Sequence, residues 1–330
     1  MRLIATMMVR DEIDVVAAMV EHHLAQGVDL LIVTDNASVD GTTEALESYA
    51  ANGRVELHHD AEHRKQQGAV VTRMARRART EHRADWVLNL DADEFMVPRD
   101  RSATLRECLE QTPLHLNAFT VPVTNLVGPA ARAGGGIGRL AWRDHRSDEE
   151  LQQIGIHAQP TPNAVHRGEC DIVVAQGNHF VSLVSNGQPH DEVSTEVLHL
   201  PWRSWAQLEQ KVLNAGRAYE NNPELRPSPN HHGMKDYRRH QAGALFEAYL
   251  ARTPLRSDLE QGQVDGRYRR DDWLAVHLRA LVSDALEPDL LRAVVDPGTD
   301  HPIPDDEHAA GAAVGLAQLS AEPPVPARGG

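Results

Sequence analysis

The sequence predicts an α/β fold in which a mostly parallel sheet is flanked by helices and followed by a helical C-terminal extension. The first observation is that short apolar runs, at residues 3–9, 30–33 and 86–90, each end in a cluster of polar residues. The second is that the stretches between these runs carry apolar residues every three or four positions, as amphipathic helices do. Strands that alternate with helices in this way form a parallel sheet.

The first hundred residues contain this alternation in order. The run 3–9 is continuous, as expected for a strand that is covered on both faces of a sheet. The helix after it is expected to end at Gly27, because glycine is favoured just beyond a helix C-terminus. The later elements are expected as strand 30–33, helix 42–50, strand 55–58, helix 66–82 and strand 86–90. Ligands bind beyond the carboxyl ends of such strands, so the polar clusters at 10–12, 35–40 and 91–94 should converge.

Beyond residue 118 the pattern changes. Strand-like runs are expected at 119–123, 172–174 and 180–184, with loops between them. The stretch 133–138 is rich in glycine and is expected to be mobile.

Helices dominate the last third of the chain. Three are expected, at 204–220, where Ser204 is placed as the cap, and near 236–251 and 271–294. The end of the chain has many Pro, Gly, Ala and acidic residues and no periodic pattern, which predicts disorder. We therefore expect a main domain over 1–200, a helical extension packed on it over 201–295, and a disordered tail over 296–330.

The composition narrows the possible partners and the location. With 330 residues and a formal net charge of −15, the chain is not expected to bind nucleic acid, which requires a basic surface. Two cysteines in the whole chain are typical of a reducing compartment. No apolar run approaches the roughly 20 residues of a transmembrane helix, and the first strand shows no signal-peptide cleavage site. We expect a cytoplasmic protein that could also lie peripherally on a membrane.

Three carboxylates fall within four residues, Asp91, Asp93 and Glu94, at the end of a buried strand. Such groups repel one another, and a divalent cation relieves the repulsion. Mg²⁺ and Mn²⁺ prefer carboxylate and phosphate oxygens, and they often bind one or two protein carboxylates together with substrate phosphates. In an extended segment, Asp91 and Asp93 would point to one side and Glu94 to the other. The alternative is a solvated acidic turn.

Four segments of the first hundred residues carry a more specific pattern. They are Met8-Val9-Arg10-Asp11-Glu12, Asp35-Asn36-Ala37-Ser38-Val39-Asp40-Gly41-Thr42, Gly68 to Arg73, and Asn89-Leu90-Asp91-Ala92-Asp93-Glu94-Phe95. In order and spacing they resemble a family-2-type glycosyltransferase, of the subgroup with an Asp-x-Asp-Glu-Phe motif. This family has the GT-A fold, which is built on a Rossmann-like sheet. The chain departs from the family pattern where Asp11 and Met74 replace its usual asparagines.

The resemblance implies a nucleotide-sugar site in the main domain. By position, Asp35 would accept a hydrogen bond from the base, the main chain near Val9 would line the base pocket, and Arg73 would reach the base or the diphosphate. The other residues that the resemblance places at the nucleotide are Arg10, Glu12, Asn36, Ser38 and Asp91. The alternatives without a functional role are that Asp35 and Asp40 only cap the helix that begins at Thr42, and that Arg73 is a solvated helix residue.

A second group of residues lies at His199-Leu200-Pro201-Trp202-Arg203-Ser204. It resembles a His-x-Pro-x-Arg-Ser segment of the same subgroup. Imidazole is a competent ligand for manganese, so His199 is the candidate to join Asp91 and Asp93 at the metal. Arg203 and Lys211 are candidate diphosphate contacts, and Gly177-Asn178-His179 is a weaker candidate for contact with the donor or acceptor sugar. The alternative for His199 is a packed histidine in a strand.

The catalytic base has the weakest signal. Transfer with inversion needs a group that takes the proton of the acceptor hydroxyl. Asp191 and Glu192 lie in a polar loop downstream of the metal motif and are the candidates. Loop acids are, however, usually solvated charges.

The sequence thus predicts a metal-dependent glycosyltransferase. It would use Mn²⁺ or Mg²⁺ to move a sugar from a nucleoside diphosphate sugar to an unknown acceptor, which could be a glycan, a lipid, a protein or a small molecule. Inversion at the sugar carbon is implied by the family-2 resemblance. A metal-dependent nucleotidyltransferase is one alternative, although the expected glycine-rich loop after the first strand is missing. The other alternative is a non-catalytic nucleotide-sugar-binding protein.

Overall fold

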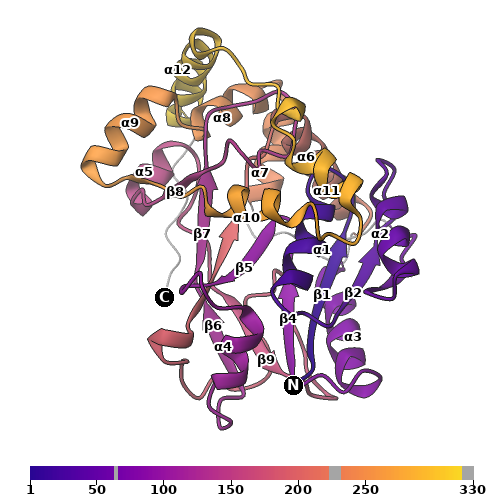
Figure 1. The fold of residues 1–330 in the computed structure, drawn as a ribbon. Coiled ribbons are helices and arrows are strands. Elements are labelled where there is room, and N and C mark those ends of the chain that lie inside the picture. The colour runs from indigo at the N-terminus through magenta and orange to yellow at the C-terminus, as the bar shows by residue number, and fades with distance from the viewer. Residues whose placement is uncertain (63–65, 223–231, 322–330) are drawn as a thin grey trace. The chain divides into compact units, whose positions relative to one another are not determined.

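The computed structural model describes residues 1–62, 66–222 and 232–321 (Figure 1). They form two compact units. Unit 1 comprises Met1–Thr124, Pro160–His199 and Val276–Val295, and unit 2 comprises Asn125–Gln159, Leu200–Ala275 and the described residues from Asp296 onward. The sequence predicted a single boundary at residue 200. In the structure, unit 2 also includes residues 125–159 and unit 1 also includes residues 276–295.

Unit 1 is built on a six-stranded sheet in the order β3-β2-β1-β4-β9-β6. Its strands are β1 (Leu3–Val9), β2 (Leu30–Asp35), β3 (Val55–His59), β4 (Trp86–Leu90), β6 (Ala118–Val121) and β9 (Asn163–Arg167). The first four are parallel to one another, while β9 is antiparallel to both β4 and β6. This confirms the predicted α/β class with a mostly parallel sheet.

The helices of unit 1 pack on its strands or on one another. They are α1 (Val16–Ala25), α2 (Thr42–Ala51), α3 (Gln67–Thr80), α4 (Leu105–Gln111) and α11 (Pro288–Val295). Helix α3 buries Val70, Val71 and Met74 against Ile4 and Ile32 of the sheet, in one hydrophobic cluster. Each buried side chain of this size contributes roughly 1.5–3 kcal/mol. The spacing of the stripe on α3 is what predicted the helix from the sequence.

Two further strands of unit 1 form an antiparallel pair beside the acidic segment. They are β5 (Glu94–Pro98) and β10 (Thr195–His199), and their register sets His199 opposite Glu94. A short 3₁₀ turn, η1 (Asp191–Val193), precedes β10. The pairing brings together residues about a hundred positions apart in the sequence.

Unit 2 is mainly helical. Its small antiparallel sheet has the order β11-β8-β7, made of β7 (Val123–Val127), β8 (Trp142–Asp144) and β11 (Tyr268–Arg270). Its helices include α5 (Asp148–Gln153), α6 (Trp205–Glu220), α7 (His232–Gln241), α8 (Leu245–Arg252), α9 (Arg256–Asp265) and α12 (Asp305–Ala321), and α10 (Trp273–Leu281) begins in this unit. The predicted C-terminal helices are therefore confirmed as a feature of the fold.

The predicted disordered tail is wrong over much of its length, because α12 is a helix that lies against α8. A Cβ atom on Gly315 would collide with the Glu247 carbonyl oxygen, and one on Gly311 would collide with Leu250. The helix is thus held by close backbone approach rather than by a stripe of large apolar residues. This is why its Gly- and Ala-rich sequence lacks the usual periodic signal. The rest of the predicted tail, 322–330, lies outside the described residues.

Other expected elements are shorter than predicted. The runs 172–174 and 180–184 form a single bridge between Val174 and Val181 rather than two strands. The helix expected at 236–251 is interrupted between α7 and α8 near Gly243, whose φ of 71° is left-handed. The one expected at 271–294 is likewise two helices, α10 and α11. In the glycine-rich stretch, Ile137 is buried and the Gly136 N–H donates to Asp300 at 3.1 Å.

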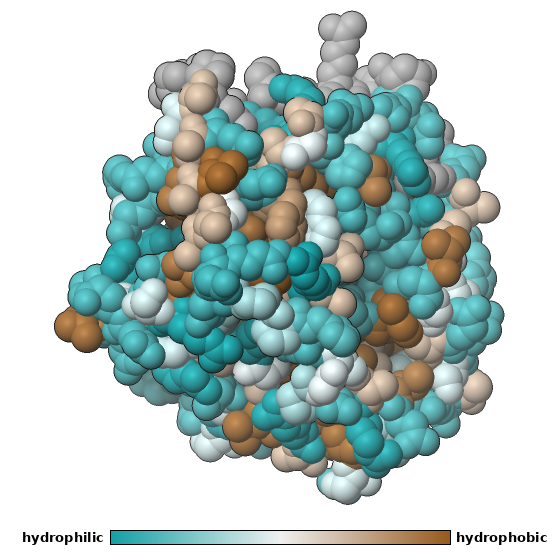
Figure 2. All heavy atoms as spheres, turned by 90° about the horizontal axis from the view of Figure 1, so that it is seen from above, coloured by the Kyte–Doolittle hydropathy of each residue, from teal (hydrophilic) through white to brown (hydrophobic). Residues whose placement is uncertain are grey.

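The face of the molecule in Figure 2 is largely hydrophilic, with hydrophobic side chains scattered over it. Some exposed large hydrophobic residues, such as Leu114 and Phe180, lie in loops, and others lie on the helices α9, α10 and α12. Among the described residues, no helix is both long and apolar enough to cross a bilayer.

Candidate functional site

The polar clusters of unit 1 meet at the carboxyl edge of its parallel strands. The register pairs Val9 at the end of β1 with Asp35 at the end of β2, and Asp35 with His59 at the end of β3. On the other side of β1, Met7 pairs with Leu90, so Asp91 emerges from the same edge. The structure therefore brings the predicted nucleotide and metal residues of this unit to one edge of the sheet.

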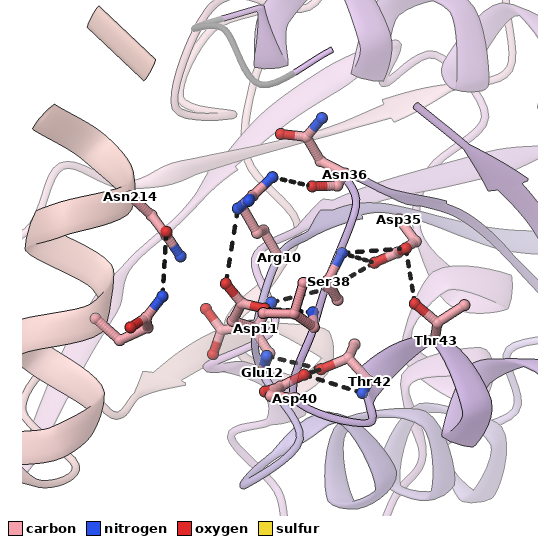
Figure 3. A network of polar contacts seen from close by, with 12 residues as sticks. Arg10, Asp11, Glu12, Asp35, Asn36, Ser38, Asp40, Thr42, Thr43 and Asn214 are labelled. Carbon is pink, nitrogen blue, oxygen red and sulfur yellow. Dashed lines mark hydrogen bonds and ion pairs between the residues drawn. The ribbon is translucent and has the colours of Figure 1, made fainter. Parts of the chain in front are cut away.

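The loops after β1 and β2 are bound to each other (Figure 3). Asp11, at a left-handed φ of 56°, accepts a hydrogen bond from the Val39 N–H at 2.8 Å, and its own N–H donates to the Ser38 hydroxyl at 3.0 Å. Arg10 donates to the Asn36 carbonyl at 2.5 Å. Positive φ is uncommon outside glycine, and asparagine and aspartate tolerate it best. Asp11 can therefore adopt the backbone conformation of this turn.

Asp35 is buried and organises the β2–α2 loop. Its carboxylate accepts hydrogen bonds from the Ser38 hydroxyl and from the Thr43 hydroxyl, the latter at 2.9 Å (Figure 3). Asp40 accepts from the N–H and the hydroxyl of Thr42 at 3.0 and 2.6 Å. Asp40 thus bonds the main-chain N–H of the first residue of α2, whereas Asp35 bonds Ser38 of the loop and the Thr43 side chain, not a main-chain N–H of the helix. A carboxylate offers about four acceptor sites, so Asp35 retains capacity for a further donor.

A pocket of about 510 Å³ adjoins this edge. It is lined by Thr34, His58, His59, Asp60, Glu62, Gln66, Val70, Arg73, Met74 and Arg77. The His59 imidazole lies 3.9 Å from the Asp35 carboxylate. Arg77 is paired with Glu56, whereas the exposed Arg73 has no ion pair or hydrogen bond to another residue in the described part of the chain. Arg73 is therefore the guanidinium of this pocket that can bind an added anion or base.

The acidic segment is a turn, not the extended stretch expected from the sequence. The Glu94 N–H donates to the Asp91 carbonyl at 3.1 Å, and the Asp91 N–H donates to the Glu94 carboxylate at 3.2 Å. The turn holds all three carboxylates close together. Burial, and then the charges of Asp91 and Asp93, raise the pKa of Glu94 well above its usual range. The repulsion that predicted a cation is therefore present in the folded protein.

Asp93 and His199 lie together as predicted. The Asp93 carboxylate is buried, and one oxygen lies 3.7 Å from His199 Nε2. His199 is there because β10 runs antiparallel to β5 and ends opposite Glu94. The Asp91 carboxylate accepts from Gln67 Nε2 at 2.8 Å and from Asn178 Nδ2 at 3.1 Å.

These donors fit a hard divalent cation by their chemistry. Carboxylate oxygens and an imidazole nitrogen are ligands of Mn²⁺, and Mg²⁺ binds the oxygens with substrate phosphates completing its shell. In the described residues, no three His, Cys, Asp or Glu side chains are already arranged as a metal site. The predicted set of Asp91, Asp93 and His199 would therefore have to close around the ion.

The base candidates lie away from the acidic turn. Asp191 and Glu192 are exposed residues of η1, at the start of β10, whereas His199 is at its end. At about 3.3 Å per residue, β10 alone separates them by roughly 13 Å. The structure does not bring these two acids to Asp93.

The remaining predicted contacts belong to unit 2. Arg203 is fully buried, and its carbonyl accepts a hydrogen bond from Arg139. Lys211 is exposed on α6. Their role at a diphosphate stays a prediction.

Sequence reasoning missed Asn163 and gave little weight to His179. Asn163, the buried first residue of β9, donates to the Glu94 carboxylate at 2.7 Å, and its Oδ1 lies 3.1 Å from His179 Nδ1. Gly177 and Asn178 have left-handed φ values of 85° and 63°, and from this turn Asn178 contacts Asp91 and His179 contacts Asn163. The sequence signal for the turn was Gly177-Asn178; Asn163 had none, because its partners are remote in the sequence.

Comparison with known proteins agrees with the enzyme class. A family model described as glycosyltransferase family 92 matches residues 4–120, which confirms the predicted class, a glycosyltransferase. Assignment to family 2 and its Asp-x-Asp-Glu-Phe subgroup stays a prediction. A search of curated proteins finds no significant match.

Several solved structures are similar to the chain at low identity. S. aureus TarS 1-349 is 11% identical over 89% of this chain and 90% of that chain, with a TM-score of 0.38. TarS 1-349 in complex with UDP-GlcNAc is 11% identical over the same shares, with a TM-score of 0.37. The glucosyl-3-phosphoglycerate synthase from Mycobacterium tuberculosis, in complex with Mn²⁺, UDP and glucosyl-3-phosphoglycerate, is 17% identical over 50% of this chain and 56% of that chain, with a TM-score of 0.28.

Proposed function

We propose that the chain is a metal-dependent glycosyltransferase of GT-A type that moves a sugar, with inversion, from a nucleoside diphosphate sugar to an acceptor hydroxyl. The observation that carries the proposal is the meeting of Asp93 and His199, 3.7 Å apart, beside the carboxylate turn at the carboxyl edge of a parallel sheet. Ligands of such sheets bind at that edge. The pocket at the ends of β2 and β3 adjoins the same edge.

The nucleoside would occupy this pocket. Asp35 would accept a hydrogen bond from the base, with the main chain at Val9 beside it and Arg73 reaching the base or the diphosphate. Arg10, Glu12, Asn36 and Ser38 would act mainly by holding the two loops in place. Figure 3 supports this division, because the contacts that it draws join the loop after β1 to the segment that follows β2.

The diphosphate would lie at the acidic turn. Asp91, Asp93 and His199 would hold Mn²⁺ or Mg²⁺, and a bound cation would neutralise charge on the leaving diphosphate. Gln67 and Asn178 both donate to the same oxygen of Asp91 and so orient its carboxylate.

A donor panel tests this function. The protein is incubated with UDP-, GDP- and dTDP-sugars and Mn²⁺, and free nucleoside diphosphate is measured; slow hydrolysis of one donor is expected, because water can replace the acceptor. UDP-GlcNAc and UDP-glucose belong in the panel. If no donor is hydrolysed and none binds in a metal-dependent way, the function is contradicted. Binding without hydrolysis would indicate a binding protein, and pyrophosphate release from a nucleoside triphosphate and a sugar phosphate would indicate a nucleotidyltransferase.

Replacement of Arg73 should weaken nucleotide binding without changing stability. A hydrogen bond to a charged group contributes about 1.5–3 kcal/mol, so Arg73→Ala is expected to raise the Kd of the bound nucleoside diphosphate by about 10- to 100-fold. Calorimetric titration measures the Kd, and thermal unfolding measures the stability. Arg54→Ala, which removes an exposed arginine elsewhere in unit 1, is the matched control and should leave the Kd unchanged. Equal Kd values for Arg73→Ala and the wild type would remove Arg73 from the site.

A further inference from the structure

One histidine beside the acidic turn, so far only a weak candidate for contact with a sugar, has no part in the proposed function as described above. His179 is half-buried, and its Nδ1 lies 3.1 Å from Asn163 Oδ1. The preceding residue, Asn178, donates to the Asp91 carboxylate at 3.1 Å. Asn178 and Gly177 form a left-handed turn, and the charges of Asp91 and His199, two of the proposed metal ligands, act on the His179 ring that follows it. His179 therefore lies at the place where sugar transfer would occur under the proposed function.

The hydrogen bonds of Asn163 favour one of the two neutral forms of the His179 ring. One Glu94 oxygen, Oε2, accepts both from the Asp91 main-chain N–H and from Asn163 Nδ2, at 3.2 and 2.7 Å. Asn163 therefore presents its amide nitrogen to Glu94 and its oxygen to His179. An amide oxygen only accepts, so Nδ1 of His179 is the donor and Nε2 carries the lone pair.

Nε2 also has space beside it. A Cβ atom on Gly177 would lie 3.1 Å from Nε2, so the missing side chain leaves that edge of the ring uncovered. Burial lowers the pKa of His179, although the charge of Asp91 acts in the opposite direction. The lowered pKa keeps the ring neutral near pH 7. The charged or titratable groups that act on it are Asp91 and His199.

We propose that His179, oriented by Asn163, is the catalytic base that takes the proton of the acceptor hydroxyl. This rests on the proposed function. The acceptor O–H proton passes to Nε2 as the oxygen forms its bond to the sugar carbon. The bond from that carbon to the diphosphate oxygen breaks, and the nucleoside diphosphate leaves with the electron pair. The imidazolium then returns its proton to water. Asp191 and Glu192, at the far end of β10, take no part.

The test compares His179→Ala and His179→Gln with the wild type, using the panel's best-hydrolysed nucleotide sugar and Mn²⁺. General bases contribute about 100- to 10,000-fold, so kcat should fall at least 100-fold in both variants. The Kd of the nucleoside diphosphate with Mn²⁺ should stay within about twofold, because His179 is not needed for binding. Added imidazole should restore part of the kcat of His179→Ala. His115→Gln, an exposed histidine of unit 1, is the control and should retain full activity.

Each other outcome overturns the inference. A kcat of His179→Ala within threefold of the wild type would show that His179 is not the base. A loss of kcat that imidazole does not restore, together with weaker nucleoside diphosphate binding, would assign it a structural role. A wild-type protein that hydrolyses no donor would overturn the proposed function and this inference with it, so the two failures are distinguishable.

Discussion

Asp93→Ala is expected to abolish metal-dependent donor binding while the protein stays folded. Asp93 is one of the proposed cation ligands and lies beside His199, so its loss should weaken donor binding in Mn²⁺ by more than about 100-fold. The structure buries Asp93, with an exposed fraction of 2%. Its removal is still tolerable, because the charges of Asp91 and Asp93 disfavour ionisation of Glu94. In the absence of metal, the variant should be at least as stable as the wild type.

Titration calorimetry with a nucleotide sugar, with and without Mn²⁺, measures this effect, and thermal unfolding in EDTA measures the stability. Glu47→Ala, which removes an exposed acid on α2 of the same unit, is the matched control and should bind like the wild type. Unchanged manganese-dependent affinity in Asp93→Ala would remove the acidic turn from the metal site.

Acidification below pH 6.5 is expected to destabilise the protein, because unit 1 buries neutral histidines. Burial lowers the pKa of His23 and of His166 to about 4, and it lowers the pKa of His22 well below its ordinary value. In the unfolded chain these groups titrate near 6.5, so between pH 6.5 and 4 the unfolded state binds more protons. The contribution of these neutral histidines to the free energy of unfolding is complete above pH 6.5 and is lost as the pH falls toward 4.

The expected loss is about 3 kcal/mol each for His23 and His166 between pH 6.5 and 4. Denaturant unfolding at several pH values across this range measures it. His166→Gln should show a shallower dependence than the wild type, whereas His115→Gln, at an exposed position, should show the same dependence. An unfolding free energy that stays constant from pH 7 to 5 would contradict the burial of neutral histidines.

The parallel half of the sheet could be predicted because its signals are local. β1, β2 and β4 are continuous apolar runs, and α3 shows its buried stripe in the sequence. By contrast, β9 is a short strand whose partners are remote in the sequence. The sequence did not predict α12, because this helix contacts α8 closely through glycines and not through a large apolar face.

The difference between local sequence signals and contacts remote in the sequence also applies to the candidate site. Asp35 and Asp91 follow strands whose parallel arrangement is predictable, so their convergence was too. His199 came from a family resemblance, and the β5–β10 register gives the physical reason for its position. The direction of β10 could not be seen in the sequence, and this direction is what takes Asp191 and Glu192 away from the acidic turn. The link between Asn163 and His179 likewise exists only once β9 has paired.

Release of nucleoside diphosphate from a nucleotide sugar by the wild-type protein tests the central claim most directly. It is measured with Mn²⁺ present, after chelation by EDTA, and after Mn²⁺ is restored. The account predicts release with Mn²⁺, loss of at least 100-fold in EDTA, and full recovery when Mn²⁺ returns. Release at the same rate in EDTA, or no release from any donor in Mn²⁺, would contradict a metal-dependent glycosyltransferase.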